Sequence, residues 1–294
     1  MSSKTPFLNA TKNFSHSPVR ATYIPTPEGL RLSRISAFST PKFIKDGWEL
    51  QKVIKSAVDL GEVTDDELTY IPEAYLDGIE VEASSDPDLA ARFHVINQRR
   101  ARRRARQRAL DLIMCNPDLD TFATFTYAPD EDIDRVSYDE CYSALRPWLS
   151  NRVSRKGLKY VCATEKQRSG GIHFHMLANS NALALDAARS PYTGRPLKHN
   201  GKPLFNVTDW KHGFTSAENV SGEDANTKVA KYIFKYMEKN DVMIGGRYFL
   251  HGGSLAEPFY LYGDSVEEFI DGEPTFVKDV QIGEHLTYKE LSFL

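Results

Sequence analysis

The chain contains 294 residues, of which 41% are hydrophobic, and its formal net charge is −3. No run of eighteen or more apolar residues occurs and the N-terminal MSSKTPFLNATKNFSHSP has no apolar core, so neither a membrane span nor a secretory signal is expected. Cys115, Cys141 and Cys162 lack C-x-x-C spacing and are expected to be reduced thiols of a cytoplasmic protein. The negative charge argues against a nucleic-acid partner, but its distribution matters more than its sum.

The N-terminal region is polar and contains several prolines. Residues 1 to about 45 include Pro18, Pro25, Pro27 and Pro41 without a sustained hydrophobic period, which indicates a flexible or loosely attached arm. We therefore divide the chain into a partly flexible N-terminal extension (1–95), a main domain (96–260) and a C-terminal extension (261–294). The segment 61–90 of the first part holds ten acidic residues and no Lys or Arg.

The segment QRRARRRARQR, Gln98–Arg108, then reverses the sign of the charge. Arginine and alanine favour helix, and one helix is predicted from about Asp88 to Cys115. The arginines could form a solvated helix face, contact the acidic segment or bind a polyanionic partner. Because like charges so closely spaced repel one another, the third interpretation is favoured. The arginines assigned to DNA binding are Arg99, Arg100, Arg102, Arg103, Arg104, Arg106 and Arg108.

The central part of the chain alternates between strand and helix patterns. TFATFTY, residues 121–127, is rich in β-branched and aromatic residues and predicts a strand. A helix is predicted for 138–155, a strand for 158–164 and another strand for 172–178, the two strands forming a hairpin. Residues 179–212 are expected to be irregular, and a strand-like pattern returns at 214–219.

Two of the eight histidines flank a phenylalanine in GGIHFHMLAN, Gly170–Asn179. In a strand, residues i and i+2 point to the same face, so His173 and His175 should stand side by side while Phe174 points away. This geometry suits two metal ligands, and it also occurs for ordinary histidines of a sheet.

The last strong element is DANTKVAKYIFKYMEKN, residues 224–240, a predicted helix with a plausible cap at Asp224. Tyr232 and Tyr236 are four residues apart, and so they are neighbours on the seam between an apolar face and a basic stripe. Tyrosines at such a boundary are common, and the pair gains meaning from the histidines elsewhere in the chain. The lysines of the basic stripe are Lys228, Lys231, Lys235 and Lys239.

Paired histidines, a basic face and a tyrosine at its rim are the parts that covalent cleavage of a phosphodiester requires. A divalent cation neutralises the phosphate and polarises phosphorus, and two neutral imidazoles need a harder, charged ligand to hold it. Glu165 is the best candidate because it ends the neighbouring strand, and His199 and His212 come next. A tyrosine with a pKa of about 10 needs help to attack, and Lys235 and Lys239 are near enough in sequence to give it.

The order TFATFTY, then GIHFHML with its preceding acidic residue, then KVAKYIFKYMEK resembles the three motifs of HUH endonucleases. The pattern is most similar to the rolling-circle replication initiation (Rep) proteins of plasmids and single-stranded DNA phages in which an arginine-rich helix precedes the first motif. The resemblance covers roughly Gln98–Gly253. It implies an α+β fold with a central antiparallel sheet flanked by helices, of the ferredoxin-like or split βαβ type, which would make 96–260 the endonuclease domain.

The resemblance also implies an activity. Glu165, His173 and His175 would bind Mg or Mn, and Tyr232 or Tyr236 would attack single-stranded origin DNA, leaving a 5′-phosphotyrosyl ester and a free 3′-OH. Two tyrosines favour a cycle in which one opens the strand and the other closes it. Such a protein would act in a bacterial cytoplasm with a separate host helicase and polymerase, because the chain has no G-x-x-x-x-G-K-[ST] motif.

Other functions remain open at this point. A conjugative relaxase or a tyrosine-dependent transposase would use the same chemistry, although relaxases usually show a third histidine near the pair. A non-catalytic binder of single-stranded nucleic acid would use the arginines and aromatics alone. An intracellular structural metal protein would have no use for the seven arginines.

Overall fold

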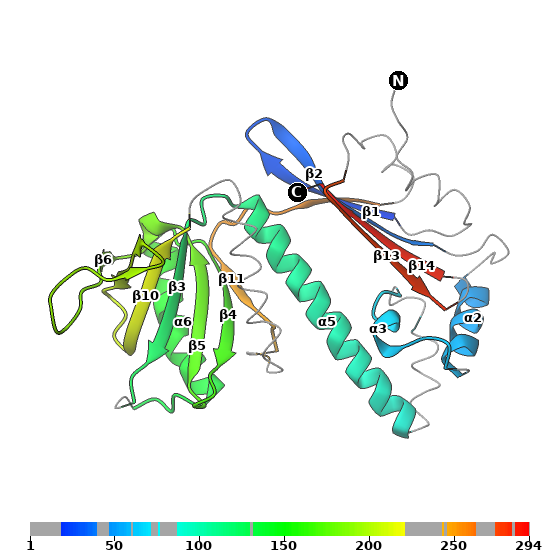
Figure 1. Ribbon diagram of the computed structural model, residues 1–294, viewed down its shortest axis with the longest axis horizontal. Helices are drawn as coiled ribbons and strands as arrows, with labels where there is room; N and C mark the ends of the chain where they lie inside the picture. The colour runs from blue at the N-terminus through cyan, green and yellow to red at the C-terminus, as the bar shows by residue number, and fades with distance from the viewer. Residues whose placement is uncertain are drawn as a thin grey trace. The chain divides into compact units, whose positions relative to one another are not determined.

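The computed structural model describes residues 19–39, 47–59, 61–71, 76, 87–129, 132–220, 243, 246–262, 274–283 and 286–293. The chain forms two compact units (Figure 1). Unit 1 comprises residues 1–103 and 258–294, and unit 2 comprises residues 104–257. No helix among the described residues is long and apolar enough to cross a membrane.

Unit 2 is built around a seven-stranded sheet in the order β11-β4-β5-β3-β10-β9-β6. Every neighbouring pair in it is antiparallel. The chain therefore has a mixed α/β composition with large antiparallel sheets, as expected for the predicted fold class. The strands are β3 (Thr121–Tyr127), β4 (Tyr160–Lys166), β5 (Ile172–Ala178), β6 (Leu185–Ala187), β9 (Phe205–Val207), β10 (Gly213–Asn219) and β11 (Leu250–Gly252), with the separate hairpin β7 (Lys198–His199) and β8 (Lys202–Pro203).

Helix α6 (Tyr138–Lys156) packs on one face of this sheet. The Ser137 side chain accepts a hydrogen bond from the backbone N–H of Glu140, and Gly157 ends the helix in the left-handed conformation. Acidic residues lie in the first turn and basic residues in the last, which suits the helix dipole. Leu145 and Leu149 are buried against the sheet.

The opposite face of the sheet carries a second core. Ala109, Leu112 and Ile113 come from the C-terminal part of α5 (Pro87–Cys115), and they cluster with Val161 of β4 and Leu177 of β5. Apolar side chains therefore cover part of both faces, and the period of two along each strand decides which residues meet which helix.

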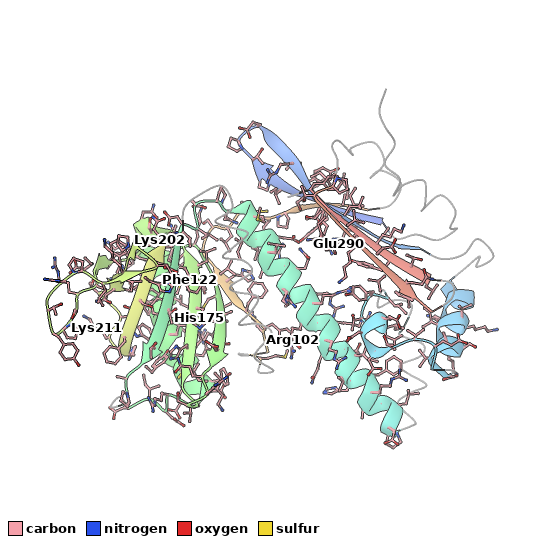
Figure 2. The ribbon with its side chains drawn as sticks, in the orientation of Figure 1. Arg102, Phe122, His175, Lys202, Lys211 and Glu290 are labelled. Atoms are coloured by element: carbon pink, nitrogen blue, oxygen red, sulfur yellow. The ribbon has the colours of Figure 1, made fainter. Side chains whose placement is uncertain are left out.

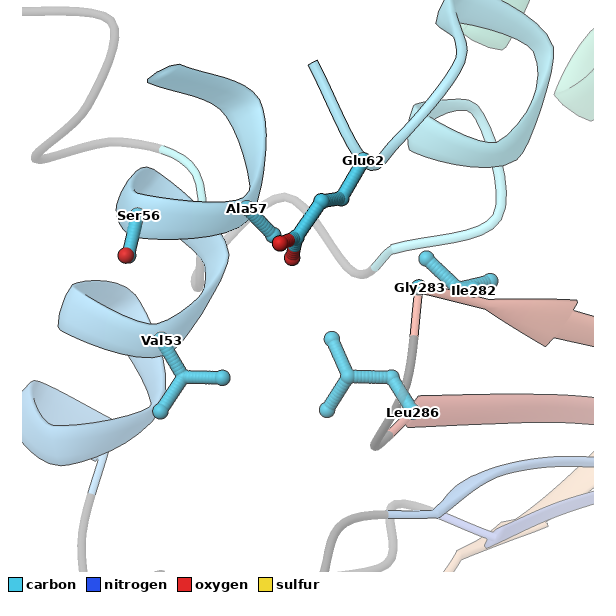
Figure 3. Close-up of a pocket in the computed structure, with 7 residues that line it drawn as sticks. All are labelled: Val53, Ser56, Ala57, Glu62, Ile282, Gly283 and Leu286. Atoms are coloured by element: carbon cyan, nitrogen blue, oxygen red, sulfur yellow. The ribbon is translucent and has the colours of Figure 1, made fainter. Parts of the chain in front are cut away.

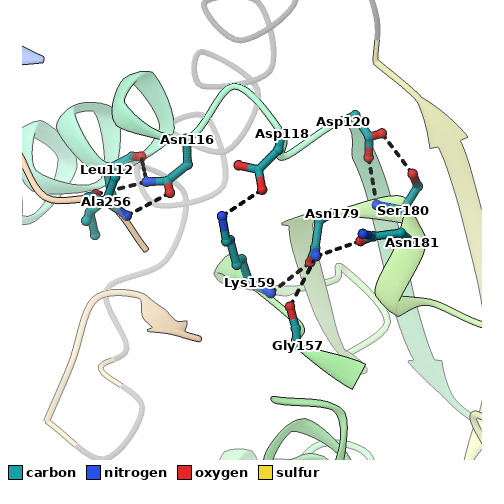
Figure 4. A network of polar contacts seen from close by, with 10 residues as sticks. All are labelled: Leu112, Asn116, Asp118, Asp120, Gly157, Lys159, Asn179, Ser180, Asn181 and Ala256. Atoms are coloured by element: carbon teal, nitrogen blue, oxygen red, sulfur yellow. Dashed lines mark hydrogen bonds and ion pairs between the residues drawn. The ribbon is translucent and has the colours of Figure 1, made fainter. Parts of the chain in front are cut away.

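A polar network joins the segments that lead into and out of the sheet (Figure 4). The Asn116 side-chain amide donates to the carbonyls of Leu112 (2.7 Å) and Ala256 (2.9 Å), and its oxygen accepts from the Ala256 N–H at 2.8 Å. Asn179 accepts from the Lys159 N–H at 2.8 Å. These side chains satisfy backbone groups that would otherwise be buried without partners.

Unit 1 contains a five-stranded antiparallel sheet in the order β12-β1-β2-β14-β13. Its strands are β1 (Val19–Thr26), β2 (Gly29–Ser39), β12 (Phe259–Tyr262), β13 (Phe276–Ile282) and β14 (Leu286–Ser292). Helices α2 (Gly47–Asp59) and α3 (Asp65–Leu68) share a core with Phe93 and Ile96 of α5 and with Ile282 and Leu286.

A small pocket of about 210 Å³ lies inside unit 1 between α2 and the β13–β14 turn (Figure 3). Its lining is mostly apolar, and Glu62 contributes the single carboxylate. The lining residues are Val53, Ser56, Ala57, Glu62, Ile282, Gly283 and Leu286.

The elements match the sequence-based expectations in several places and differ in three. The strands 121–127 and 172–178 and the helices near 88–115 and 138–155 are present within a residue or two. Residues 19–39 form a hairpin with a two-residue turn at Pro27–Glu28, whereas a loosely attached arm was expected. Strand β4 extends to Lys166 and so includes Glu165, and residues 179–212 contain short strands instead of irregular chain.

Candidate metal centre and nucleic-acid site

The two faces of β5 differ in character, as the sequence predicts. Phe174 and Met176 point into the core beneath α6. His173, His175 and Leu177 alternate with them and share the other face. The ring centroids of His173 and His175 are 6.2 Å apart. The strand therefore presents two imidazoles side by side at the polar end of a face whose other end is apolar.

Glu165 lies on the neighbouring strand β4, directly opposite His173 in the antiparallel register. Its carboxylate reaches diagonally to His175, with Oε2 3.1 Å from the ring Nε2. Long side chains can bridge such diagonal positions between antiparallel strands. The side chains of His175 and Glu165 are only 5% and 16% exposed, so this contact forms in a largely dry environment.

Thr124 of β3 holds the other nitrogen of His175. The two residues are register partners, and the Thr124 Oγ1 lies 3.1 Å from Nδ1. The ring also stacks on Phe122, with centroids 5.9 Å apart and planes within 5° (Figure 2). A threonine hydroxyl can donate or accept, so it supports either tautomer of the ring. If Nε2 binds a cation, Nδ1–H can donate to Thr124, the usual arrangement behind a metal-bound histidine.

His173 is only partly buried, and its Nδ1 lies 3.3 Å from the Gln167 side-chain nitrogen. That amide can only donate, so Nδ1 accepts and the ring is neutral in this arrangement. Burial lowers the pKa of His173 below its ordinary value, and the nearby Glu165 opposes the shift only partly. A neutral imidazole is the form that binds metals.

These residues match a divalent cation in chemistry, and two of the three expected donors already meet. Glu165 and His175 converge on one point, whereas the His173 ring turns to Gln167. Within the described residues no three His, Cys, Asp or Glu side chains are gathered as a metal group. A third donor would require His173 to turn from Gln167 toward the pair, or a ligand from elsewhere.

The two histidines expected as alternative ligands have other partners. His199 on β7 has Nδ1 3.2 Å from the Glu218 Oε2. The His212 ring packs 5.0 Å from Trp210 and 6.3 Å from Tyr127, in the aromatic cluster beneath α6. The structure therefore brings Glu165 to the histidine pair and leaves His199 and His212 apart from it.

Phe214 is a site residue that the sequence analysis overlooked. It lies on β10 opposite Thr126, which is in turn opposite His173, so all three side chains share one face. Phe214 is 70% exposed, which is unusual for a phenylalanine on a sheet. An exposed ring beside the histidines can stack on a nucleic-acid base. The β-strand pattern at 214–219 was recognised, but its register against β3 could not be read from the sequence.

The arginine-rich part of α5 is used partly for folding. Arg100 is 4% exposed and donates to the Ile71 carbonyl at 3.0 Å. The Arg103 guanidinium lies over the Tyr70 ring at 4.0 Å, and Arg99 pairs with Asp66 at 2.8 Å. Arg108 pairs with Glu257 inside unit 2. Some contacts of the arginines with the acidic segment thus exist, the second of the three interpretations considered for them.

The predicted tyrosine helix lies outside the described residues. This applies to Tyr232 and Tyr236 and to Lys228, Lys231, Lys235 and Lys239, which together carry the proposed nucleophiles and part of the basic face. Their roles remain predictions from the sequence.

Comparison with known proteins adds one finding. Residues 120–241, less than half of the chain, match the family model for the replication-associated protein ORF2. Neither a curated protein nor a solved structure matches. The matched segment begins next to β3, contains Glu165 and the histidine pair, and extends past the predicted tyrosine helix. This similarity supports a part in the initiation of DNA replication.

Proposed function

We propose that this chain is a replication-initiation endonuclease of the HUH type, which nicks single-stranded origin DNA of a phage or plasmid through tyrosine attack and later rejoins the strand. The observation that carries the proposal is the cluster of Glu165, His173 and His175 on one face of β4 and β5. The cluster lies in the segment that is similar to replication-associated proteins.

The cluster is suited to activate a phosphodiester. Glu165 and His175 converge, and His173 is a neutral imidazole beside them. We propose that these three hold Mg or Mn. Bound there, the cation would neutralise a non-bridging oxygen and polarise phosphorus.

The tyrosine hydroxyl of Tyr232 or Tyr236 would supply the nucleophile. Its oxygen forms a bond to phosphorus while the bond from phosphorus to O3′ breaks. The phenol loses its proton, and the departing O3′ gains one. The products are a 5′-phosphotyrosyl ester and a free 3′-OH that a host polymerase can extend. Lys235 and Lys239 would favour the phenolate by their charge, and strand closure would reverse the same exchange.

A metal-dependent nicking assay with site variants tests the proposal. His173→Ala and His175→Ala should abolish cleavage of single-stranded DNA while leaving most of the DNA affinity, because affinity comes mainly from cations that contact phosphates. Glu165→Gln should reduce metal dependence less than loss of a histidine, since the amide keeps an oxygen. His251→Ala, an exposed histidine on β11, is the matched control and should cleave normally.

Several results would contradict the proposal. Cleavage that proceeds without metal in either histidine variant would remove the metal site. DNA binding without cleavage in the wild type would favour a non-catalytic binder of single-stranded nucleic acid, for which the exposed Phe214 is a suitable feature. A relaxase or transposase would still cleave, and it would differ in the DNA sequences that it joins.

A further inference from the structure

A second feature of unit 2 is an arm formed by residues 188–204, which connects β6 and β9. The arm is folded by backbone hydrogen bonds. Ala188 N–H donates to the Leu204 carbonyl (2.9 Å), Leu197 N–H to the Ala188 carbonyl (2.7 Å), and Leu204 N–H to the Leu197 carbonyl (3.0 Å). Strands β7 and β8 form a hairpin within it. The arm therefore holds its side chains in a defined arrangement.

The tip of the arm is a tight turn that presents one aromatic ring. The Ser190 N–H donates to the Arg195 carbonyl at 2.9 Å, and the Ser190 Oγ accepts from the N–H groups of Tyr192 (3.3 Å) and Thr193 (3.2 Å). The Arg189 guanidinium closes the turn by donating to the Gly194 carbonyl at 3.0 Å. Tyr192 is 95% exposed, so this ordered turn leaves a large ring with almost no protein contact.

The arm is strongly basic in a chain that is acidic overall. From Ala188 to Leu204 it contains four Lys or Arg residues and no Asp or Glu. Arg195, Lys198 and Lys202 are all exposed, and none of them forms an ion pair with a described residue (Lys202 is labelled in Figure 2). Exposed cations on such an element favour a polyanion, and an exposed aromatic ring among them favours one that has stackable bases.

The base of the arm contacts the same face of the sheet that carries the histidine pair. His199 of β7 pairs with Glu218 of β10. Glu218 is opposite Phe122, and Phe214 on the same strand is opposite Thr126, so these side chains alternate onto the histidine face. A strand of DNA that crosses this face at Phe214 would thus find the arm on the same side of the sheet.

We propose that this arm binds the single-stranded DNA that flanks the cleavage site. Arg195, Lys198 and Lys202 contact its phosphates, and Tyr192 stacks on a base. The inference rests on the proposed function for the identity of the ligand, but the arm's contribution is a matter of binding and can be measured without cleavage.

The test is equilibrium binding of a fluorescent 30-residue oligothymidylate at several salt concentrations. The triple variant Arg195→Ala, Lys198→Ala, Lys202→Ala should bind more weakly, and the slope of log K against log salt should flatten by roughly 2, because three phosphate contacts are lost. The control removes Arg146, Arg155 and Lys156, three exposed cations of α6, which packs on the other face of the sheet. It should change the slope much less.

Substitution of the tip separates stacking from charge. Tyr192→Ala should weaken binding by roughly 5- to 150-fold without changing the salt slope, whereas Tyr192→Phe keeps the ring and should bind like the wild type. The inference is overturned if the triple variant and the α6 control have equal slopes, or if Tyr192→Ala binds normally. Cleavage that continues in that case would leave the proposed function standing, whereas loss of arm binding in a chain that never cleaves DNA would leave the arm standing alone.

Discussion

His175 is fixed from three sides: Glu165 contacts one ring nitrogen, Thr124 the other, and Phe122 stacks on the ring plane. Each partner comes from a different strand position on one face of the sheet. Such a ring has little freedom, and a ligand that is already oriented binds a cation with a smaller loss of entropy. His173 has a looser setting, with Gln167 as its partner on an exposed turn.

Thr124 should therefore matter for metal binding although it is not expected to be a ligand. Thr124→Val keeps the shape but removes the hydroxyl, and we expect the affinity for Mn²⁺ to fall by about tenfold because the Nδ1 proton loses its acceptor. Titration calorimetry measures this affinity. Thr124→Ser should restore it, and Thr126→Val, on the same face of β3, should leave it unchanged. Equal affinities of Thr124→Val and the wild type would show that the hydroxyl does not position the ring.

At this scale the sequence predicted much of the site. The spacing of His173 and His175 requires that they share a face once the segment is a strand, and Glu165 was placed next to them by the expected hairpin. Thr124, Gln167 and Phe214 were missed, since their proximity depends on strand register and turn shape. These are set by contacts between residues distant in the sequence.

The three cysteines were also correctly predicted to be unpaired. Cys115, Cys141 and Cys162 are free and buried. Burial is the main cause that raises the pKa of the Cys115 and Cys141 thiols to about 12. They therefore stay protonated at neutral pH and serve as small apolar side chains of the core.

At the scale of elements, Asn116 connects the end of α5 to residue 256 through three hydrogen bonds (Figure 4). It is 1% exposed, so water cannot replace the amide. Asn116→Ala should lower the free energy of unfolding of unit 2 by about 2–3 kcal/mol, because the N–H and carbonyl of Ala256 lose their partner. Urea denaturation measures this change.

The matched control is Asn151→Ala on the exposed side of α6, which should cost no more than about 0.5 kcal/mol. If the two variants have the same stability, the network does not hold the connection. The network could not be foreseen from the sequence, because the Asn116-Pro117 step was recognised only as the boundary between helix and strand.

Helix α5 shows why a run of like charges is hard to interpret from sequence. Its ends carry apolar residues that pack into different cores, Phe93 and Ile96 into one and Leu112 and Ile113 into the other. The arginines lie between them, and the partners of Arg100 and Arg103 come from residues near 70 and near 288. Neither partner follows from helix periodicity, so the length of α5 was predictable and the use of its arginines was not.

At the scale of the whole molecule, the N-terminal and C-terminal segments fold together in unit 1. Strand β2 pairs with β14, which begins more than 240 residues further along the chain, and β1 pairs with β12. A hairpin pattern interrupted by prolines looked like a loose arm, because the strands that complete its sheet lie at the other end of the sequence. The segment similar to replication-associated proteins, 120–241, covers most of unit 2 and none of the described sheet of unit 1.

The central claim is that a tyrosine of this chain forms a covalent bond with DNA when Glu165, His173 and His175 hold a metal. The most direct measurement is incubation of the full chain with Mn²⁺ and a pool of random single-stranded oligonucleotides labelled at the 3′ end, followed by denaturing electrophoresis and mass spectrometry of the labelled protein. A 5′-phosphotyrosyl ester keeps the 3′ label on the protein after denaturation.

We predict a labelled chain whose adduct lies on Tyr232 or Tyr236. Each single variant, Tyr232→Phe or Tyr236→Phe, should retain an adduct on the surviving tyrosine, because the two are neighbours on one predicted helical surface. The double variant and His175→Ala should lose it. Loss in only one of the single variants would mean that the enzyme uses a single nucleophile. An unlabelled wild-type chain, or a label that persists in the double variant, would contradict the claim.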